Sequence, residues 1–521
     1  MQTMNNIKQL LPILTWLPGY KKSYLAGDLS AGLTVGVMLI PQGMAYAMIA
    51  GLPPVYGLYA AMIPQVTYAV FGTSRQLAVG PVAMDSLLVA AAVSVFATAG
   101  TENYIALAIL LALMMGAIQL AMGVLRLGFF VNFLSRPVIS GFTSAAALII
   151  GINQLKYLVG IDLERSNNIF VILYDAVSSY AEISWLTVAI GVGGIIILKN
   201  AKKIHKAIPG ALVVVIIGII LVCLLRLDEF GVNIVGVVPQ GMPGFQLPKI
   251  DLEIVNQLMP AALTISLIAF MEAISVAKAL QTKHKEEYSI RPNQELIGLG
   301  LANVIGSMFG SYPTTGGFSR SAVNEQAGAR TNLAAIISAG LIALTLLFLT
   351  PLFYYLPKAI LASVIMVAVF GLIDLKLPKY LWKTRKEDFY MLLTAFIVTL
   401  AIGIKEGIII SVGMSLVAMI YRSTRPHYAV LGKLTNSTEY RNMARYPDVT
   451  ILPEVLIIRY DAELYFANVS HFVESINKEV AKKGDTLKLV VIHGGSMAHI
   501  DSTAYQALTD LILDLEKEGI R

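Results

Sequence analysis

Long apolar runs, separated by short polar or basic segments, make up most of the first 425 residues. Their length and their low charge are typical of membrane-spanning helices. After residue 425 the apolar runs become shorter and charged residues become more frequent. The pattern predicts a polytopic α-helical membrane protein of 14 spans, followed by a small α/β domain. The expected spans are 28–50, 55–72, a helix from 81, one ending at 126, 131–157, one ending at 199, 210–225, 254–281, 295–309, one from about 318, 333–350, 359–372, 389–403 and 407–421.

The last part of the chain has the alternation of a soluble α/β domain. Residues 455–460 and 487–492 are expected as strands, and 469–482 and 503–518 as helices. In the second helix one face is expected to carry Leu508, Leu511, Ile512 and Leu515. The predicted organisation is an N-terminal cytoplasmic segment (1–26), a transmembrane transport domain (27–425), a polar linker (426–448) and the C-terminal domain (449–521).

Residues 311–325 interrupt the apolar pattern most sharply. An extended, Pro- and Gly-broken piece leads into a short helical run whose first turn carries Arg320. Irregular backbone at membrane depth is tolerated where it lines a cavity within the protein. A half-helix that begins inside the membrane directs its N–H groups and positive dipole end into that cavity, and the arginine adds a full charge. The stretch therefore predicts an anion site, and the alternative is a solvent-exposed loop.

Composition agrees with a membrane protein. The 521 residues have a mean hydropathy of +0.70, and only 14% of them are charged. The net charge of +6 comes from Lys and Arg in short segments between spans, as the positive-inside rule describes, and it does not indicate nucleic-acid binding. These segments predict cytoplasmic N- and C-termini in a multi-pass protein of the cell (inner) membrane. The single cysteine, Cys223, excludes a disulfide within the chain, and no cleavable signal peptide is evident.

A weak internal repeat relates the two halves of the membrane region. A shift of 230 residues places Ala31, Leu33, Thr34 and Ala47 on Ala261, Leu263, Thr264 and Ala277. In that register Gln42 falls on Glu272. A similar broken segment, Gln76–Gly80 followed by Pro81, precedes a helix in the first half. Because seven spans reverse the direction of insertion, a 7+7 inverted repeat is expected, with its broken helices meeting near the midplane.

Several long motifs resemble the sulfate permease (SulP) family of anion transporters. They are Ile40-Pro-Gln-Gly-Met-Ala-Tyr-Ala, Gly72-Thr-Ser-Arg-Gln with Val79-Gly-Pro-Val-Ala, Phe270-Met-Glu-Ala-Ile-Ser-Val-Ala-Lys and Gly317-Phe-Ser-Arg-Ser-Ala-Val-Asn. The C-terminal domain is similar to the STAS domain of that family, where Ile500-Asp-Ser-Thr-Ala matches the loop before a helix. Such domains usually continue with a further strand and helix, so a domain truncated at its C-terminus is expected.

The resemblance implies a core and gate arrangement shared with nucleobase permeases, and an anion bound between spans one, three, eight and ten. It also implies a homodimer in the lipid bilayer. Asp85 departs from the family pattern, because a neutral residue is expected there. The matching substrate positions in this chain are Gln42, Tyr46, Val82, Ala83, Ser86, Gly317, Phe318, Ser319, Arg320 and Ser321.

Two carboxylates are candidates for coupling transport to a proton or to sodium. Glu272 follows a long uncharged run and Asp85 lies on span three, where an ionised acid is costly in a membrane. The alternative for Glu272 is a fixed salt bridge to Arg320 or Lys278, and Arg320 has the alternative role of neutralising an acid. The serines are equally explained by helix packing.

The sequence predicts no enzyme, no cofactor and no metal site, since no nucleophile, base and acid occur in a usable pattern and the histidines lack metal-ligand spacing. The preferred function is secondary active transport of an anion by alternating access, coupled to protons. Sulfate is the preferred substrate, with bicarbonate or a dicarboxylate as other possibilities. The alternatives are sodium-coupled bicarbonate uptake, anion exchange, nucleobase transport, and a channel-like or regulatory scaffold.

Overall fold

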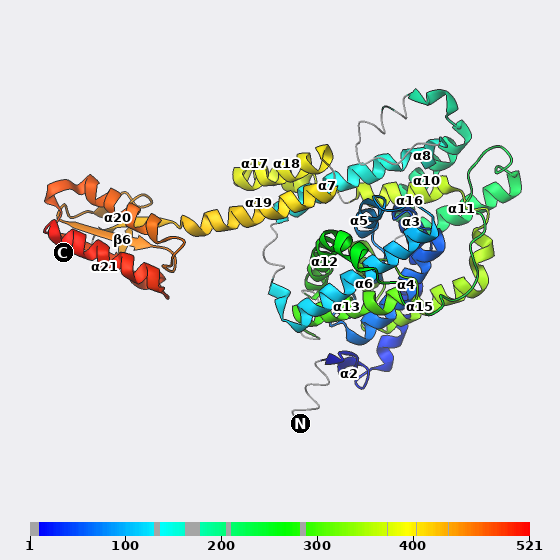
Figure 1. The fold of residues 1–521 in the computed structure, drawn as a ribbon, viewed down its shortest axis with the longest axis horizontal. Helices are drawn as coiled ribbons and strands as arrows, with labels where there is room; N and C mark the ends of the chain where they lie inside the picture. The colour runs from blue at the N-terminus through cyan, green and yellow to red at the C-terminus, as the bar shows by residue number, and fades with distance from the viewer. Residues whose placement is uncertain are drawn as a thin grey trace. The chain divides into compact units, whose positions relative to one another are not determined.

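The structure is a computed structural model, and it divides into two compact units, Met1–Val412 and Gly413–Arg521 (Figure 1). The residues that it describes are 10–129, 136–161, 174, 178–204, 210–281, 288–371, 373–402, 404–435 and 437–521.

Helices fill the first unit, which we call the transport unit. They are α2 (Ile13–Trp16), α3 (Leu25–Ile49), α4 (Pro54–Phe71), α5 (Ala83–Val93), α6 (Glu102–Val124), α7 (Arg136–Asn153), α8 (Leu155–Val159), α10 (Trp185–Ile204), α11 (Gly210–Leu225), α12 (Leu252–Gln281), α13 (Pro292–Ser307), α14 (Phe318–Gln326), α15 (Leu333–Leu344), α16 (Lys358–Phe370), α17 (Lys376–Thr384), α18 (Lys386–Ala401) and α19 (Ile404–Thr424), which continues past Val412. Two short strands, β1 (Val79–Gly80) and β2 (Thr315–Gly316), complete the unit.

Over the described residues, each of the 14 expected spans coincides with helical structure; the start of the fifth, 131–135, lies outside the described residues. The segment predicted at 131–157 is divided into α7 and α8, and the one at 333–350 continues from α15 into a π-helical turn, Thr345–Leu349. The helix α17 was not expected, since its residues were interpreted only as a basic segment. Five described helices are long and apolar enough to cross a membrane by themselves. The protein is therefore a helical membrane protein, and the number of crossings remains a prediction.

The helices of the transport unit form two packing groups. In one group α3 packs on α4 and α15, while α13 packs on α4 and α6; in the other, α16 packs on α7, α8 and α10, and α7 on α18 (Figure 1). Small residues permit the closest approaches. A methyl group on Gly57 would lie 1.9 Å from the carbonyl oxygen of Gly43, and one on Gly116 would lie 2.7 Å from that of Gly300. These glycines bring α3 against α4 and α6 against α13.

The second unit contains one sheet in the order β4-β3-β6-β7, with β5 also paired to β3. Its strands are β3 (Tyr428–Leu434), β4 (Tyr440–Asn442), β5 (Val449–Thr450), β6 (Val455–Tyr460) and β7 (Leu489–His493). The helices α20 (Val469–Lys483) and α21 (Ser502–Lys517) share a core with the buried face of β6.

Two expectations for this unit are corrected. The stretch predicted as a linker contains β3, which pairs with β6 through Tyr428 to Leu431 and so belongs to the sheet. On α21, Leu511 and Leu515 are buried, whereas Ile512 is 45% exposed, because it lies at the edge of the apolar face rather than on it.

Candidate anion-binding site

Two broken segments meet in the transport unit. The strands β1 and β2 pair antiparallel, with Val79 opposite Gly316 and Gly80 opposite Thr315. The N–H of Gly317 donates to the carbonyl of Ala78 at 3.2 Å and extends the pairing. Since α5 and α14 each begin within three residues of these strands, the strand pair brings two helix N-termini together. Their free N–H groups and dipoles make this a region of positive potential.

Local sequence explains why the backbone is broken here. Pro81 cannot donate a hydrogen bond, and small residues are required where the segments cross. A methyl group on Gly316 would lie 2.6 Å from the Leu77 side chain, and one on Gly317 would lie 2.9 Å from Nη2 of Arg320. The hydroxyl of Ser321 donates to the carbonyl of Gly317 at 2.7 Å and accepts from the N–H of Ala78 at 2.9 Å. Ser321 thus joins the two broken segments. This is a packing role, the alternative to anion binding that the sequence left open for the serines.

Side chains from neighbouring helices hold β2 in place. Asn303 of α13 accepts from the Thr314 N–H at 2.8 Å and donates to the Thr314 carbonyl at 3.0 Å. The hydroxyl of Thr315 donates to the carbonyl of Ala269 at 2.7 Å, which attaches the strand to α12. This attachment lies less than one helical turn from Glu272 and so places that carboxylate beside the broken segments.

Arg320 is 3% exposed on the first turn of α14. One of its guanidinium nitrogens, Nη1, donates to the carbonyl of Pro81, in the other broken segment. The remaining nitrogens, Nε and Nη2, are buried and have no hydrogen-bond partner among the described residues. Leaving buried charged donors unpaired is costly. The side chain is therefore suited to receive an acceptor such as an oxyanion.

Both predicted coupling carboxylates lie within electrostatic reach of Arg320. Asp85 is fully buried on α5, and neither of its oxygens has a hydrogen-bond partner among the described residues. Glu272 is partly buried on α12. Within the described part of the chain, Glu272 forms an ion pair with neither Arg320 nor Lys278, so the fixed salt bridge considered from the sequence is not formed here.

The polar wall of the site comes from α3 and from the segment before β2. Gln42 and Tyr46 are buried on α3, and Tyr46 interacts electrostatically with Arg320. The hydroxyls of Ser86 and Tyr312 are 3.0 Å apart. Tyr312 was missed in the sequence, although it lies in the interrupted stretch, because the pattern there indicated only irregular backbone.

The remaining predicted residues contribute differently. Val82 and Gly317 are the N-cap positions of α5 and α14, and Ala83 is the first residue of α5. Phe318 is 62% exposed and Ser319 is also exposed, whereas Arg320 and Ser321, on the other side of the same turn, are buried. The structure thus brings the arginine, the two acids, Tyr46, Ser86 and two helix N-termini into one region. Among the described residues no group of three or more His, Cys, Asp or Glu side chains is placed to hold a metal.

A second buried carboxylate network, on Glu295, was not predicted. Glu295 lies in the first turn of α13 and accepts hydrogen bonds from the Tyr68 hydroxyl at 2.6 Å, the Thr73 N–H at 2.7 Å and the Ser74 N–H at 3.2 Å. The Thr73 hydroxyl donates to it as well. The network attaches α13 to the segment that leads from α4 to β1.

Asp28 does the same for the second broken segment. It lies in the first turn of α3 and accepts from the N–H groups of Arg330 and Thr331 at 2.7 and 3.0 Å, and from the Thr331 hydroxyl at 2.6 Å. The segment that it fixes follows α14, the helix that carries Arg320. Glu295 and Asp28 therefore fix the segments next to the two broken pieces. Neither carboxylate is part of the anion site.

Comparison with known proteins agrees with this architecture. Residues 25–395 match the Sulfate permease family, and residues 446–521 match the STAS domain. The chain is 39% identical over 539 residues to Sulfate transporter 4.1, chloroplastic, of Arabidopsis thaliana, covering 100% of this chain and 78% of that protein. It is 34% identical over 536 residues to High affinity sulfate transporter 2 of Stylosanthes hamata, covering 99% and 81%.

Solved structures share the fold. The murine Solute Carrier 26 family member A9 anion transporter, solved in the inward-facing state, superposes with a TM-score of 0.89 at 26% identity, covering 99% of this chain and 88% of that one. The transmembrane domain of a cyanobacterial bicarbonate transporter, BicA, superposes with a TM-score of 0.65 at 24% identity, covering 77% and 98%.

Proposed function

The chain belongs to the sulfate permease family of anion transporters, and we propose that it moves sulfate across a membrane by alternating access, coupled to protons. One observation carries this proposal: the buried guanidinium of Arg320, with two unpaired nitrogens, lies where the N-termini of α5 and α14 meet. Transport, and not enzymatic chemistry, is the function of this family.

Sulfate suits the donors of this site. Backbone N–H groups at helix N-termini bind oxyanions without a metal, and a guanidinium donates to two oxygens through a planar, rigid fork, a geometry that an ammonium does not reproduce. The hydroxyl of Ser86 lies in the first turn of α5, 3.0 Å from the Tyr312 hydroxyl, and Tyr46 interacts electrostatically with Arg320. Ser321 supplies no further donor, because its proton is already engaged by Gly317.

The charge balance of the site supports coupling to protons. Arg320 provides one positive charge beside two carboxylates, those of Asp85 and Glu272. With both acids ionised, their two negative charges cancel the charge of Arg320 and the roughly half unit at each of the two helix N-termini, so no net positive charge remains to bind a dianion. A proton on either acid removes one negative charge, so a proton that accompanies sulfate makes binding more favourable.

We further propose that the protein works in the cell membrane as a homodimer, with the anion site near the midplane of a 7+7 inverted repeat. Both termini would be cytoplasmic. The basic segments between spans support this orientation. The broken helices and their central strand pair support the inverted repeat.

Uptake of labelled sulfate into proteoliposomes tests the function. An inward proton gradient should increase the initial rate, and Glu272→Gln, which mimics the protonated acid, should flatten the dependence on pH while preserving sulfate exchange. Asp85→Asn belongs in the same series, because that acid is equally placed. A sodium requirement without pH dependence would assign the acids to a cation site. Indifference to both gradients would replace coupling by anion exchange, and conductance without saturation would indicate a channel.

A further inference from the structure

We propose that α17 binds the headgroup of an anionic phospholipid through three lysines on its exposed face. The helix connects α16 to α18, and residues 359–372 and 389–403 of those segments are predicted to span the membrane. Only Arg385 separates the end of α17 at Thr384 from the start of α18 at Lys386, so these two ends lie within about 7 Å of each other. This connection places α17 at the membrane–water interface. The proposal does not depend on which anion the protein transports.

The residues of α17 form two faces. Lys376, Lys379 and Lys383 are three and four residues apart, so they lie on one face of the helix, and all three are exposed. Leu377 and Leu381 lie on the other face, and Leu381 is buried. Because α17 packs on α18 and α7, this apolar face is covered by the protein (Figure 1). The lysine face is left at the surface of the transport unit.

Exposed apolar side chains border the lysines. Tyr380 and Trp382 are exposed, and so is Leu375, which directly precedes the helix. The Trp382 ring packs edge-on against Phe389 with the ring centroids 4.9 Å apart, so it lies beside the predicted start of the next span. Tyrosine and tryptophan favour the membrane–water interface, because each combines an apolar ring with a polar group. An apolar border suits a lipid, whose headgroup is joined to acyl chains, and adds nothing to the binding of a free phosphate.

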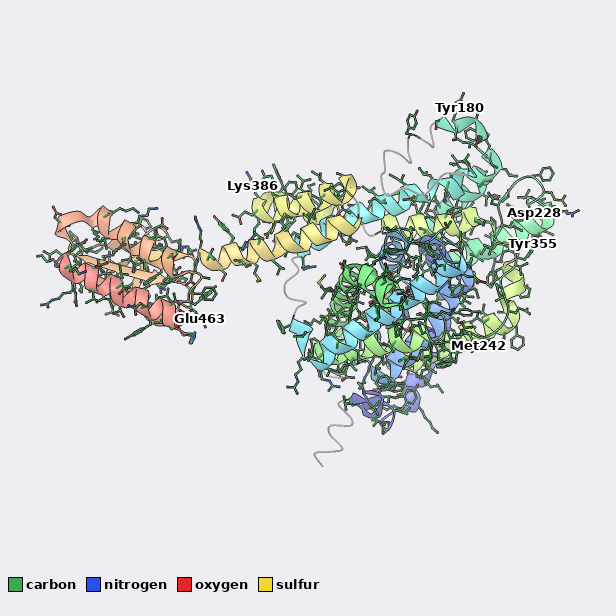
Figure 2. All side chains as sticks on the ribbon, viewed as in Figure 1. Tyr180, Asp228, Met242, Tyr355, Lys386 and Glu463 are labelled. Carbon is green, nitrogen blue, oxygen red and sulfur yellow. The ribbon has the colours of Figure 1, made fainter. Side chains whose placement is uncertain are left out.

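The charge of this surface is complementary to a phosphate headgroup. Residues 374–388 contain five basic and three acidic side chains, a net charge of +2. Of the acids, Asp374 accepts hydrogen bonds from the first two backbone N–H groups of α17 at 2.9 and 3.0 Å. The Lys386 ammonium, at the start of α18, lies 5.7 Å from the centroid of the Trp382 ring (Figure 2). Lysine binds phosphate as a compact charge, and about four to eight basic residues next to a membrane span are typical of sites for anionic lipids.

Fluorescence quenching by brominated lipids tests the proposal at Trp382. The full-length protein is reconstituted into vesicles of phosphatidylcholine and phosphatidylglycerol in equal amounts, with bromine on the acyl chains of one lipid or of the other. The chain has three tryptophans, and subtracting the signal of Trp382→Phe isolates the fluorescence of Trp382. Quenching should show an affinity for phosphatidylglycerol about tenfold above that for phosphatidylcholine, a ratio that one to two engaged lysines supply.

Two results would overturn the proposal. Equal quenching by the two lipids would mean that the lysines contact another partner, such as the second unit. Quenching by neither lipid would place α17 away from the bilayer.

Neutralising the lysine face gives the second arm. The affinity ratio should fall close to one in a protein with Lys376→Gln, Lys379→Gln and Lys383→Gln. Arginine at the same positions should preserve the ratio, because the charge remains. The matched control removes three exposed lysines of the second unit, through Lys433→Gln, Lys478→Gln and Lys488→Gln. This control should be quenched as the parent is. A preference that survives the α17 substitutions, or that is equally lost in the control, would contradict the assignment to these lysines.

Glycerol phosphate separates a lipid from a free phosphate as the ligand. An excess of it, compared with potassium chloride of equal ionic strength, should leave the quenching by brominated phosphatidylglycerol unchanged, because a soluble headgroup has no acyl chains to place beside Trp382. If glycerol phosphate removes the preference for phosphatidylglycerol, the lysine face binds phosphate from water and the lipid assignment fails.

Discussion

Replacing Glu295 by glutamine should destabilise the transport unit without touching the anion site. The carboxylate is buried at the start of α13 and is the common acceptor for the segment that leads from α4 to β1. Its Oε1 accepts from the Thr73 N–H, the Thr73 hydroxyl and the Ser74 N–H, while Oε2 accepts from the Tyr68 hydroxyl. Glutamine keeps the shape; with its carbonyl oxygen at the Oε1 position the Thr73 and Ser74 donors keep an acceptor, and its amide nitrogen at the Oε2 position donates to the Tyr68 hydroxyl, so the change mainly removes the charge.

The magnitude follows from the bonds to Oε1. Hydrogen bonds to an ionised acceptor are about twice as strong as neutral ones, a difference of about 1 kcal/mol each in net stability. Three such bonds predict a loss of about 3 kcal/mol, reduced where the bonds act as one unit. Tyr68→Phe, which removes one donor, should cost about 2 kcal/mol.

The assay is thermal unfolding of the purified protein, read from the folded fraction that remains after heating. Glu253→Gln is the matched control, since Glu253 occupies the first turn of α12 but is exposed. The Glu253 carboxylate interacts with α12 only through the helix dipole. Glu253→Gln should therefore lower the free energy of unfolding by about 0.5 kcal/mol. If Glu295→Gln unfolds at the same temperature as Glu253→Gln, the network does not support the broken segment, and our account of that attachment is wrong.

Two further outcomes are expected in the second unit. Ending the chain after Arg425 should leave the transport unit stable in detergent. Ending it after Tyr440 should promote aggregation, because β3 would then lack its pairing with β6. Equal behaviour of the two truncated proteins would contradict this prediction. Hydrogen bonds from Arg459, and then from His427, hold the pKa of Asp461 below its usual 3.8. Since the folded pKa lies below the unfolded one, this stabilisation is complete above about pH 4 and is lost as the pH falls further. Hydrogen exchange of the β3 and β6 amides should show this loss of stability at low pH in the parent protein and not in Asp461→Asn. Identical pH profiles in the two proteins would refute the role of Asp461.

The helical plan of the membrane region was predictable because hydrophobic length and breaks in periodicity are local signals. The pairing of Gln76–Gly80 with the interrupted stretch at Arg320 also followed from a local sequence pattern that the two stretches share. In each, an extended Pro- and Gly-containing piece precedes a short helix. The structure confirms that the two pieces meet as β1 and β2. The pattern did not predict which side chains from other parts of the chain contact these two pieces.

The missed residues act across long sequence separations. Glu295 accepts from Tyr68 and Thr73, more than 200 residues earlier, and an acid in a first helical turn has the same pattern whether it is exposed or buried. Tyr312 is buried beside Ser86, yet irregular backbone carries no periodicity that would orient its side chain. The strand β3 was hidden for a related reason, since its polar flanks indicated a linker and only its pairing with β6 shows otherwise.

Sulfate binding to the purified protein in nanodiscs, measured by isothermal titration calorimetry, tests the central claim most directly. Arg320→Ala should weaken binding at least about a hundredfold, because it removes the charged donors while leaving the two acids in place. Arg320→Lys should recover only part of the affinity, because the charge returns without the fork. Arg441→Ala, on the exposed surface of the second unit, should bind as the parent does. Parental affinity in a folded Arg320→Ala protein would contradict the account.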